Sequence, residues 1–215
     1  PRAPIAMSLS SDPSLLYAVF DGVAADELGV VDHVLGDPSH AEMGVLKLAI
    51  PGLSSIRGMA SLLDGRLIVY DSVARRIFEL RPTVTRNRPT GAPVLTALTV
   101  GDGTPANGFR SAVFPVGLEV QDLAQTPAGD LYALLTDAGV PALARLNPID
   151  FGVADTFGAT DGLLASIHTY FVDSYTSLEF ISETQLLALS RTQDRIERLS
   201  IAGAAPVTVV NGVAG

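Results

Sequence analysis

The chain of 215 residues contains no cysteine, no tryptophan and only three histidines. The absence of cysteine excludes disulfide bonds, thiolate nucleophiles and cysteine-ligated metal sites. A carbohydrate-binding propeller would use exposed aromatic platforms, so the absence of tryptophan and the presence of only five tyrosines disfavour that function. No run of about 18 apolar residues is present, so we expect no direct insertion into a membrane.

Charged residues are also scarce, at 17% of the chain against 47% hydrophobic residues. The net charge of −9 and the pI near 4.6 argue against nucleic-acid partners, because binding to phosphates requires basic residues. A chain with so few charges is short of residues for a fully solvated surface. We therefore expect a protein partner or a second copy of the chain to cover part of it.

What the chain does have is an internal repeat of a strand-like run that begins with leucine. Four such runs start 51, 64 and 55 residues apart, at Leu16, Leu67, Leu131 and Leu186. Each follows another apolar stretch and a polar turn, which indicates a β-hairpin. Two further apolar runs follow each hairpin, so the repeating unit is predicted to have four strands.

Four-stranded units that repeat at about 40–50 residues are typical of β-propeller blades. The sequence therefore predicts an all-β fold, a propeller of four-stranded antiparallel blades, with four blades or as part of a larger ring. We expect one domain over 1–215, with blades at 1–52, 53–101, 116–160 and 174–215. A stacked solenoid or a β-sandwich is the alternative.

The stretch GDGTPANGFRSAVFP (101–115) concentrates glycine and proline between two of these units. It lacks the lysine of a phosphate-binding loop and the alternating oxygen ligands of an EF-hand calcium loop. We interpret it as the connector that crosses from one blade to the next, where glycine and proline allow the chain to turn.

Residues 101–137 resemble the connector and hairpin of NHL-type β-propellers, in which a GDG segment precedes a Pro-x-Gly start and a Leu-Tyr strand. DSVARRIFEL (71–80) and RTQDRIERL (191–199) resemble the link between the second and third strands of that family. The first unit departs from the pattern by an acidic insert (22–43), and the last unit lacks the aspartate after its second strand. The resemblance implies a scaffold for binding. With the missing initiator methionine, it also favours an extracellular or periplasmic location.

Three aspartates, Asp21, Asp71 and Asp137, end the second strand of three units. In a propeller they would lie at equivalent positions on one face and could bind a divalent cation such as calcium. The alternative is structural, because aspartate after a strand commonly accepts hydrogen bonds from turn amides. His33 and His40, in the acidic insert, are a second conceivable metal site, and His168 is expected to be a packed or capping side chain.

A second ring is predicted at the starts of the innermost strands, near the channel of a propeller. Its members are Arg57, Gln121, Asp122, Thr176 and Glu179, of which Arg57 and Asp122 are the candidate binding residues. They do not form a catalytic set, and no nucleophile motif of a serine hydrolase is present.

The only concentrated positive charge is a cluster of arginines in the second unit. Its members are Arg75, Arg76, Arg81, Arg86 and Arg88. Guanidinium groups suit carboxylates at protein interfaces, and the rest of the chain is acidic, so self-association through this cluster is one hypothesis and a solvated edge is the other.

Taken together, these features favour a non-enzymatic protein-interaction or scaffold module without a cofactor, as a subunit of a larger exported assembly. The alternative is a metal-dependent propeller hydrolase or lactonase that uses the three aspartates as ligands.

Overall fold

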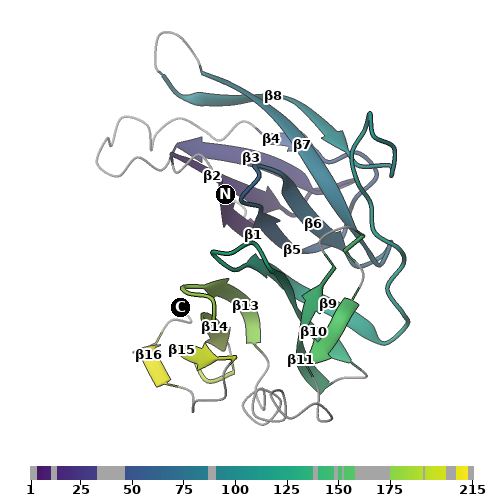
Figure 1. Cartoon of the computed structure of the whole chain (residues 1–215). Coiled ribbons are helices and arrows are strands. Elements are labelled where there is room, and N and C mark those ends of the chain that lie inside the picture. The colour runs from purple at the N-terminus through teal and green to yellow at the C-terminus, as the bar shows by residue number, and fades with distance from the viewer. Residues whose placement is uncertain are drawn as a thin grey trace. The chain divides into compact units, whose positions relative to one another are not determined.

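The computed structural model describes residues 4–10, 14–32, 47–86, 91–137, 140–147, 150–151, 153–157, 175–190, 192–201 and 207–212. Within these residues the regular elements are strands, arranged in four sheets of four antiparallel strands (Figure 1). The predicted all-β fold is confirmed. None of the described residues belongs to a helix long and apolar enough to cross a membrane.

The chain divides into two compact units, Pro1–Ser111 and Ala112–Gly215, with two sheets in each. Each sheet lies within one of the blade ranges predicted from the sequence, and its strands follow one another in chain order. The interpretation of the whole chain as one domain stays a prediction.

In the first unit, the first sheet consists of β1 (Pro4–Leu9), β2 (Leu15–Phe20), β3 (Glu27–Asp32) and β4 (Lys47–Ala49). The second consists of β5 (Ile56–Ser61), β6 (Leu67–Asp71), β7 (Arg76–Arg86) and β8 (Pro93–Val100). The two sheets share a core. Tyr17 and Val19 of β2 belong to it together with Met59, Leu67 and Val69 of the second sheet.

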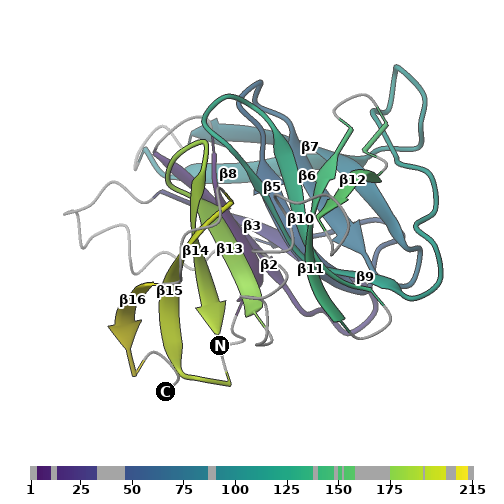
Figure 2. The same cartoon turned by 60° about the horizontal axis from the view of Figure 1, so that its bottom comes forward.

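In the second unit, the third sheet consists of β9 (Leu118–Gln125), β10 (Leu131–Asp137), β11 (Val140–Leu146) and β12 (Val153–Phe157). The fourth consists of β13 (Tyr175–Phe180), β14 (Gln185–Ser190), β15 (Arg195–Ser200) and β16 (Val207–Asn211), with β16 at the sheet edge (Figure 2). Their shared core contains Tyr132 and Leu134 of β10 and Leu178 and Leu186 of the fourth sheet. The rings of Tyr132 and Phe180 are 4.9 Å apart between centroids.

In the central strands, apolar residues occupy consecutive positions instead of alternating with polar ones. Every residue of β6 is buried, and so is every residue of β2 except Leu16. A strand that is covered on both faces needs apolar residues at consecutive positions. The high hydrophobic fraction of the chain follows from this arrangement.

The first strand of every sheet carries one extra residue where it pairs with the second strand. The pairing register shifts across Ile5, Arg57, Gln121 and Thr176. An extra residue at the same place in each pair is a β-bulge, which bends and twists the strand locally. Because the bulge recurs, it provides a common reference for comparing positions in the four sheets.

The glycine-rich stretch connects β8 to β9, as predicted, and part of it also completes a sheet. Residues Phe109 to Ser111 pair with β7, since the Glu79 N–H donates to the Phe109 carbonyl at 2.8 Å and the Ser111 N–H donates to the Ile77 carbonyl at 2.8 Å. β8 ends opposite Leu80, so these residues satisfy the edge of β7 that β8 leaves open. The connector thus contributes to the edge of the second sheet before it reaches the third.

Candidate functional site

Asp71, one of the predicted cation ligands, is buried with an exposure of 2%. Its Oδ2 accepts hydrogen bonds from the Ser54 and Ser55 N–H groups at 3.2 and 3.3 Å, and its Oδ1 accepts one from the Ala74 N–H at 2.6 Å. Both carboxylate oxygens thus hold backbone amides, in the turn after β6 and in the segment that enters β5. This is the structural alternative considered for these aspartates.

The three aspartates are not equivalent in register. In each sheet, one residue of the second strand pairs with the residue before the bulge, and in the second sheet this residue is Asp71. In the first and third sheets it is Phe20 and Leu135. Asp21 therefore lies one position beyond the equivalent of Asp71, and Asp137 lies two positions beyond it. Asp21 is exposed, and the side chain of Asp137 lies outside the described structure. In the described part of the chain, no group of three or more acidic or histidine residues is arranged to hold a metal ion. The cation site stays a prediction, and the histidines 33, 40 and 168 fall outside the described residues.

A buried carboxylate that sequence reasoning missed is Asp26, exposed by only 2%. Its Oδ2 accepts the Ile56 N–H at 2.7 Å, and its own N–H and carbonyl bond to Leu53 and Ile50. Burial raises the pKa of Asp26, the N–H groups of Ile56 and Gly22 oppose this rise, and nearby carboxylates add to it. Asp26 lies in the acidic insert, and no sequence signal separates it from the other acidic residues there.

Arg57 and Asp122, the candidate binding residues of the inner ring, lie on the first strands of different sheets. Relative to the bulges of these strands, their positions differ by one residue. Arg57 is the exposed bulge residue of β5, and Gln121 and Thr176 are the bulge residues at the same register of β9 and β13. These residues therefore lie on the first strand of their sheets, and their placement at a propeller channel stays a prediction. A ligand for them stays a prediction.

Asp122 follows the bulge of β9 and joins it to β13. Its Oδ2 accepts the Ser177 hydroxyl at 2.8 Å and the Leu178 N–H at 2.9 Å, and its Oδ1 accepts the Leu123 N–H at 2.9 Å. Burial raises the pKa of Asp122 to about 6 against the effect of these hydrogen bonds, with a smaller contribution from the charge of Glu179. Burial also raises the pKa of Glu179.

The arginine cluster is engaged within its own unit. Arg81 Nε lies 2.6 Å from Glu79 Oε1, and Arg81 Nη1 donates to the Ala106 carbonyl at 3.1 Å. Arg86 pairs with Asp32 Oδ2 at 2.7 Å and also bonds to Gly91 and Ser14.

The remaining arginines of the cluster are placed differently. Arg76 Nη1 reaches the Ser111 carbonyl at 3.4 Å, Arg75 is half-buried with φ 50°, and Arg88 lies outside the described residues. Arg81 and Arg86 hold strands and loops together, so they are not a free basic patch.

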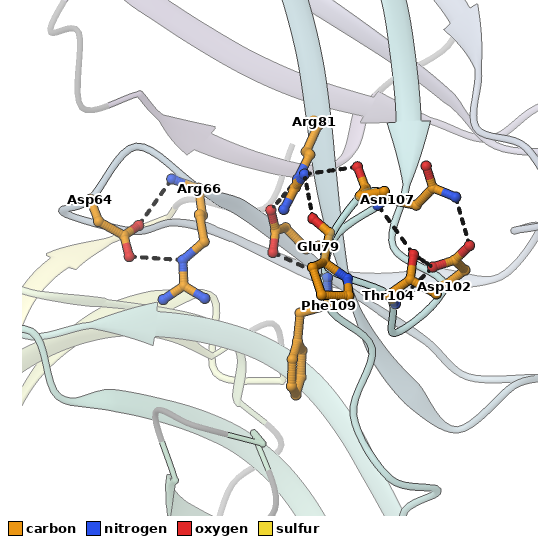
Figure 3. A network of polar contacts seen from close by, with 10 residues as sticks. Asp64, Arg66, Glu79, Arg81, Asp102, Thr104, Asn107 and Phe109 are labelled. Atoms are coloured by element: carbon orange, nitrogen blue, oxygen red, sulfur yellow. Dashed lines mark hydrogen bonds and ion pairs between the residues drawn. The ribbon is translucent and has the colours of Figure 1, made fainter.

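Figure 3 shows the polar contacts that hold the glycine-rich loop. Asp102 accepts the Thr104 N–H at 2.8 Å, the Thr104 hydroxyl at 2.7 Å and the Asn107 side-chain amide at 2.7 Å. The Asn107 and Thr104 side chains lower the pKa of Asp102 to about 2. The buried Glu79 accepts the Phe109 N–H at 3.2 Å beside its ion pair with Arg81. Asp102 of the loop and Glu79 of β7 thus both hold the loop in place.

The surface that stands out is apolar and lies on β1. Ile5, Met7 and Leu9 are exposed by 43%, 59% and 58%; strand alternation places Met7 and Leu9 on one face, and Ile5 is the bulge residue before them. A second exposed apolar set lies on β16, all of whose residues are exposed, with Val209 at 53%. The alternating apolar residues of PIAMSL are the sequence signal that could have identified the first of these surfaces.

No protein-family model and no curated protein sequence matches this chain. Solved structures do match, at low identity. Virginiamycin B lyase from Staphylococcus aureus is 12% identical with a TM-score of 0.52, over 99% of this chain and 72% of the lyase. Aldose sugar dehydrogenase from Streptomyces coelicolor is 17% identical with a TM-score of 0.52, over 98% and 68%. Hydrazine synthase from Kuenenia stuttgartiensis is 12% identical with a TM-score of 0.51, over 96% of this chain and 49% of that one.

The sheets are β-propeller blades. The propeller-repeat prediction is confirmed at the level of the fold, and the NHL resemblance rests on the quoted residues. The three matched proteins are named as enzymes, but at these identities the likeness shows the fold alone, which hosts many functions. In blade terms, β1 is the first strand of the first blade and β16 is the outer strand of the last.

Proposed function

We propose that this chain is a non-enzymatic protein-interaction module that uses the exposed face of β1 to bind a protein partner. The observation that carries the proposal is the row of Ile5, Met7 and Leu9 on a single strand, each exposed by more than two fifths. Apolar area left in water costs about 25 cal/mol per Å², and contiguous apolar surface commonly marks a protein interface.

The state of the buried carboxylates supports this choice over a hydrolase. Asp26, Asp71 and Asp122 direct their oxygens at backbone amides or a neighbouring hydroxyl. A catalytic acid or metal ligand needs an oxygen that is available to substrate or cation. Membership of a larger assembly and a location outside the cytoplasm remain parts of the proposal that follow from the sequence.

The test is a site-specific photo-cross-link in the cells that produce the protein. A diazirine amino acid replaces Met7 in one version of the chain and Val73 in a control version. Val73 is a single apolar side chain, 75% exposed in the turn after β6. We expect a protein adduct from position 7 well above the level at position 73. Equal yields at the two positions would contradict the proposal.

A further inference from the structure

Asparagine followed by glycine is a sequence at which a protein chain readily modifies itself. The backbone nitrogen of the glycine can attack the side-chain amide carbon, because glycine has no Cβ to obstruct the approach. Aspartate before glycine reacts in the same way but more slowly, since a carboxylate resists attack. The described residues contain such pairs at Asp21–Gly22, Asp64–Gly65, Asp102–Gly103, Asn107–Gly108 and Asn211–Gly212.

The glycine N–H group, which must be available for this attack, is hydrogen-bonded in every pair but one. In the described part of the chain, the Gly108 N–H donates no hydrogen bond. Asn107–Gly108 therefore combines the more reactive side chain with an available nucleophile. The other N–H groups donate to the Asp26 carboxyl group from Gly22, and to the carbonyls of Leu62, Gly108 and Asp194 from Gly65, Gly103 and Gly212.

A neighbouring carboxylate holds the Asn107 side chain. Asn107 Nδ2 donates to Asp102 Oδ2 at 2.7 Å, and Asp102 also accepts the Thr104 N–H and hydroxyl (Figure 3). The pKa of Asp102 is lowered to about 2 by these side-chain bonds, so Asp102 is ionised near neutral pH. An ionised acceptor binds the amide firmly and has no proton to give to departing ammonia. All of these contacts lie within the unit Pro1–Ser111.

We propose that Asn107 is a site of spontaneous deamidation and that its hydrogen bond to Asp102 limits the rate. The Gly108 nitrogen loses its proton to hydroxide and forms a bond to Asn107 Cγ, which closes a succinimide ring. The bond between Cγ and Nδ2 breaks, and the nitrogen leaves as ammonia after taking a proton from water. A water molecule then opens the ring at either carbonyl and leaves aspartate or isoaspartate. The proposal is independent of the β1 surface and of its partner.

Conversion would remove a bond that orders the glycine-rich loop. A carboxylate at position 107 faces the ionised Asp102 in place of an amide donor, and like charges repel. Isoaspartate also lengthens the backbone just before Gly108, whose carbonyl accepts the Gly103 N–H at 3.0 Å. The loop leads into Phe109–Ser111, which pair with β7, so deamidation loosens the edge of the second blade.

The test follows the purified full chain in mildly alkaline buffer at physiological temperature over several weeks. Peptide mass spectrometry measures the conversion of amide to acid at Asn107 and at Asn211. We expect conversion at Asn107 in the wild type, and conversion faster by about 10-fold or more in Asp102→Ala, because this variant lacks the charged acceptor. The rate at Asn211 should be the same in both proteins. Asp64→Ala, which removes a carboxylate from another turn of the same unit, is the control and should leave the rate at Asn107 unchanged.

If Asp102→Ala proves unfolded by circular dichroism, Asp102→Ser takes its place, since a serine hydroxyl still accepts a turn amide but carries no charge. An Asn107 side chain that stays unconverted in the variant, or that converts at equal rates in variant and wild type, would overturn the proposal.

Hydrogen exchange measures the effect of conversion on the loop. It compares the wild type with Asn107→Asp, which has the aspartate product at this position. We expect the Gly103 N–H to exchange faster in Asn107→Asp by about 10-fold or more. Equal exchange at Gly103 in the two proteins would show that conversion leaves the loop closed.

Discussion

At the scale of single residues, buried carboxylates in this protein accept hydrogen bonds from the backbone amides at the start of a blade. Asp26 and Asp71 bind the consecutive amides of Ser54, Ser55 and Ile56 where the chain enters the second blade. Amides at this point have no strand partner on that side, so an acceptor is required. A buried carboxylate bonded to several N–H groups is a charge-assisted and therefore strong acceptor.

We predict that Asp71→Asn lowers the free energy of unfolding by about 1–3 kcal/mol, because the amide replaces one acceptor oxygen with a donor that faces N–H groups. Urea unfolding measures the change. Asp64→Asn is the control, since Asp64 is exposed and bonds to Arg66 in a turn.

The wild-type melting temperature should not respond to millimolar calcium. A calcium-dependent rise that Asp71→Asn abolishes would instead favour the metal site.

Asp122 should make stability depend on pH. Because its pKa is raised to about 6, the folded chain binds this proton more tightly than the unfolded chain, so stability falls as pH rises from about 4 to 6. Asp122→Asn keeps an acceptor for Ser177 and Leu178, turns an amide donor toward the Leu123 N–H, and cannot ionise. We predict that the difference in unfolding free energy between variant and wild type shifts in favour of the variant as pH rises over this range, by up to about 3 kcal/mol.

The measurement is the difference between the unfolding free energies of wild type and Asp122→Asn at a series of pH values. Asp130→Asn, which removes a carboxylate from an exposed turn of the same unit, is the control variant. A flat difference for Asp122→Asn would show that this carboxyl titrates normally.

At the scale of elements, the outer edge of the second blade is built from two pieces of chain. β8 pairs with the distal part of β7, and Phe109–Ser111 return to pair with its proximal part after the loop that Asp102 organises. Gly101 permits this return, since a Cβ there would lie 1.9 Å from the Phe109 carbonyl oxygen. The loop is thus part of the sheet edge.

Gly108 tests how tightly this loop is held. It has φ +86°, and a Cβ would lie 3.0 Å from Arg81 Nε and 3.1 Å from the buried Glu79 Cδ. Gly52 has φ +75° with nothing within 4 Å, so Gly52→Ala measures the backbone cost alone, about 1–2 kcal/mol. We predict that Gly108→Ala costs about 1 kcal/mol more in thermal or urea unfolding. Equal losses would show that the Glu79–Arg81 pair gives way freely.

At the scale of the whole molecule, a partner that covers the exposed residues of β1 would connect stability to assembly. If that partner is a second copy of the chain, association stabilises only the folded state, so the melting temperature must depend on concentration. We predict a rise on the order of 2–4 °C for each tenfold increase in wild-type concentration and no rise for Met7→Asp. Scanning calorimetry over two decades of concentration measures it. A wild-type melting temperature independent of concentration would argue against assembly.

The repeat of apolar strands and turns in the sequence by itself determined the all-β fold, the four units and most of their strands, because these depend on contacts between near neighbours in the chain. The roles of the polar residues were decided only by tertiary structure. Asp122 meets Leu178 across 56 positions and Arg86 meets Asp32 across 54, through pairings that no local pattern encodes. The same is true of exposure. Met7 and Met59 are the same residue at the same register, but Met7 is exposed, whereas Met59 is buried because it packs in the core that the second blade shares with the first.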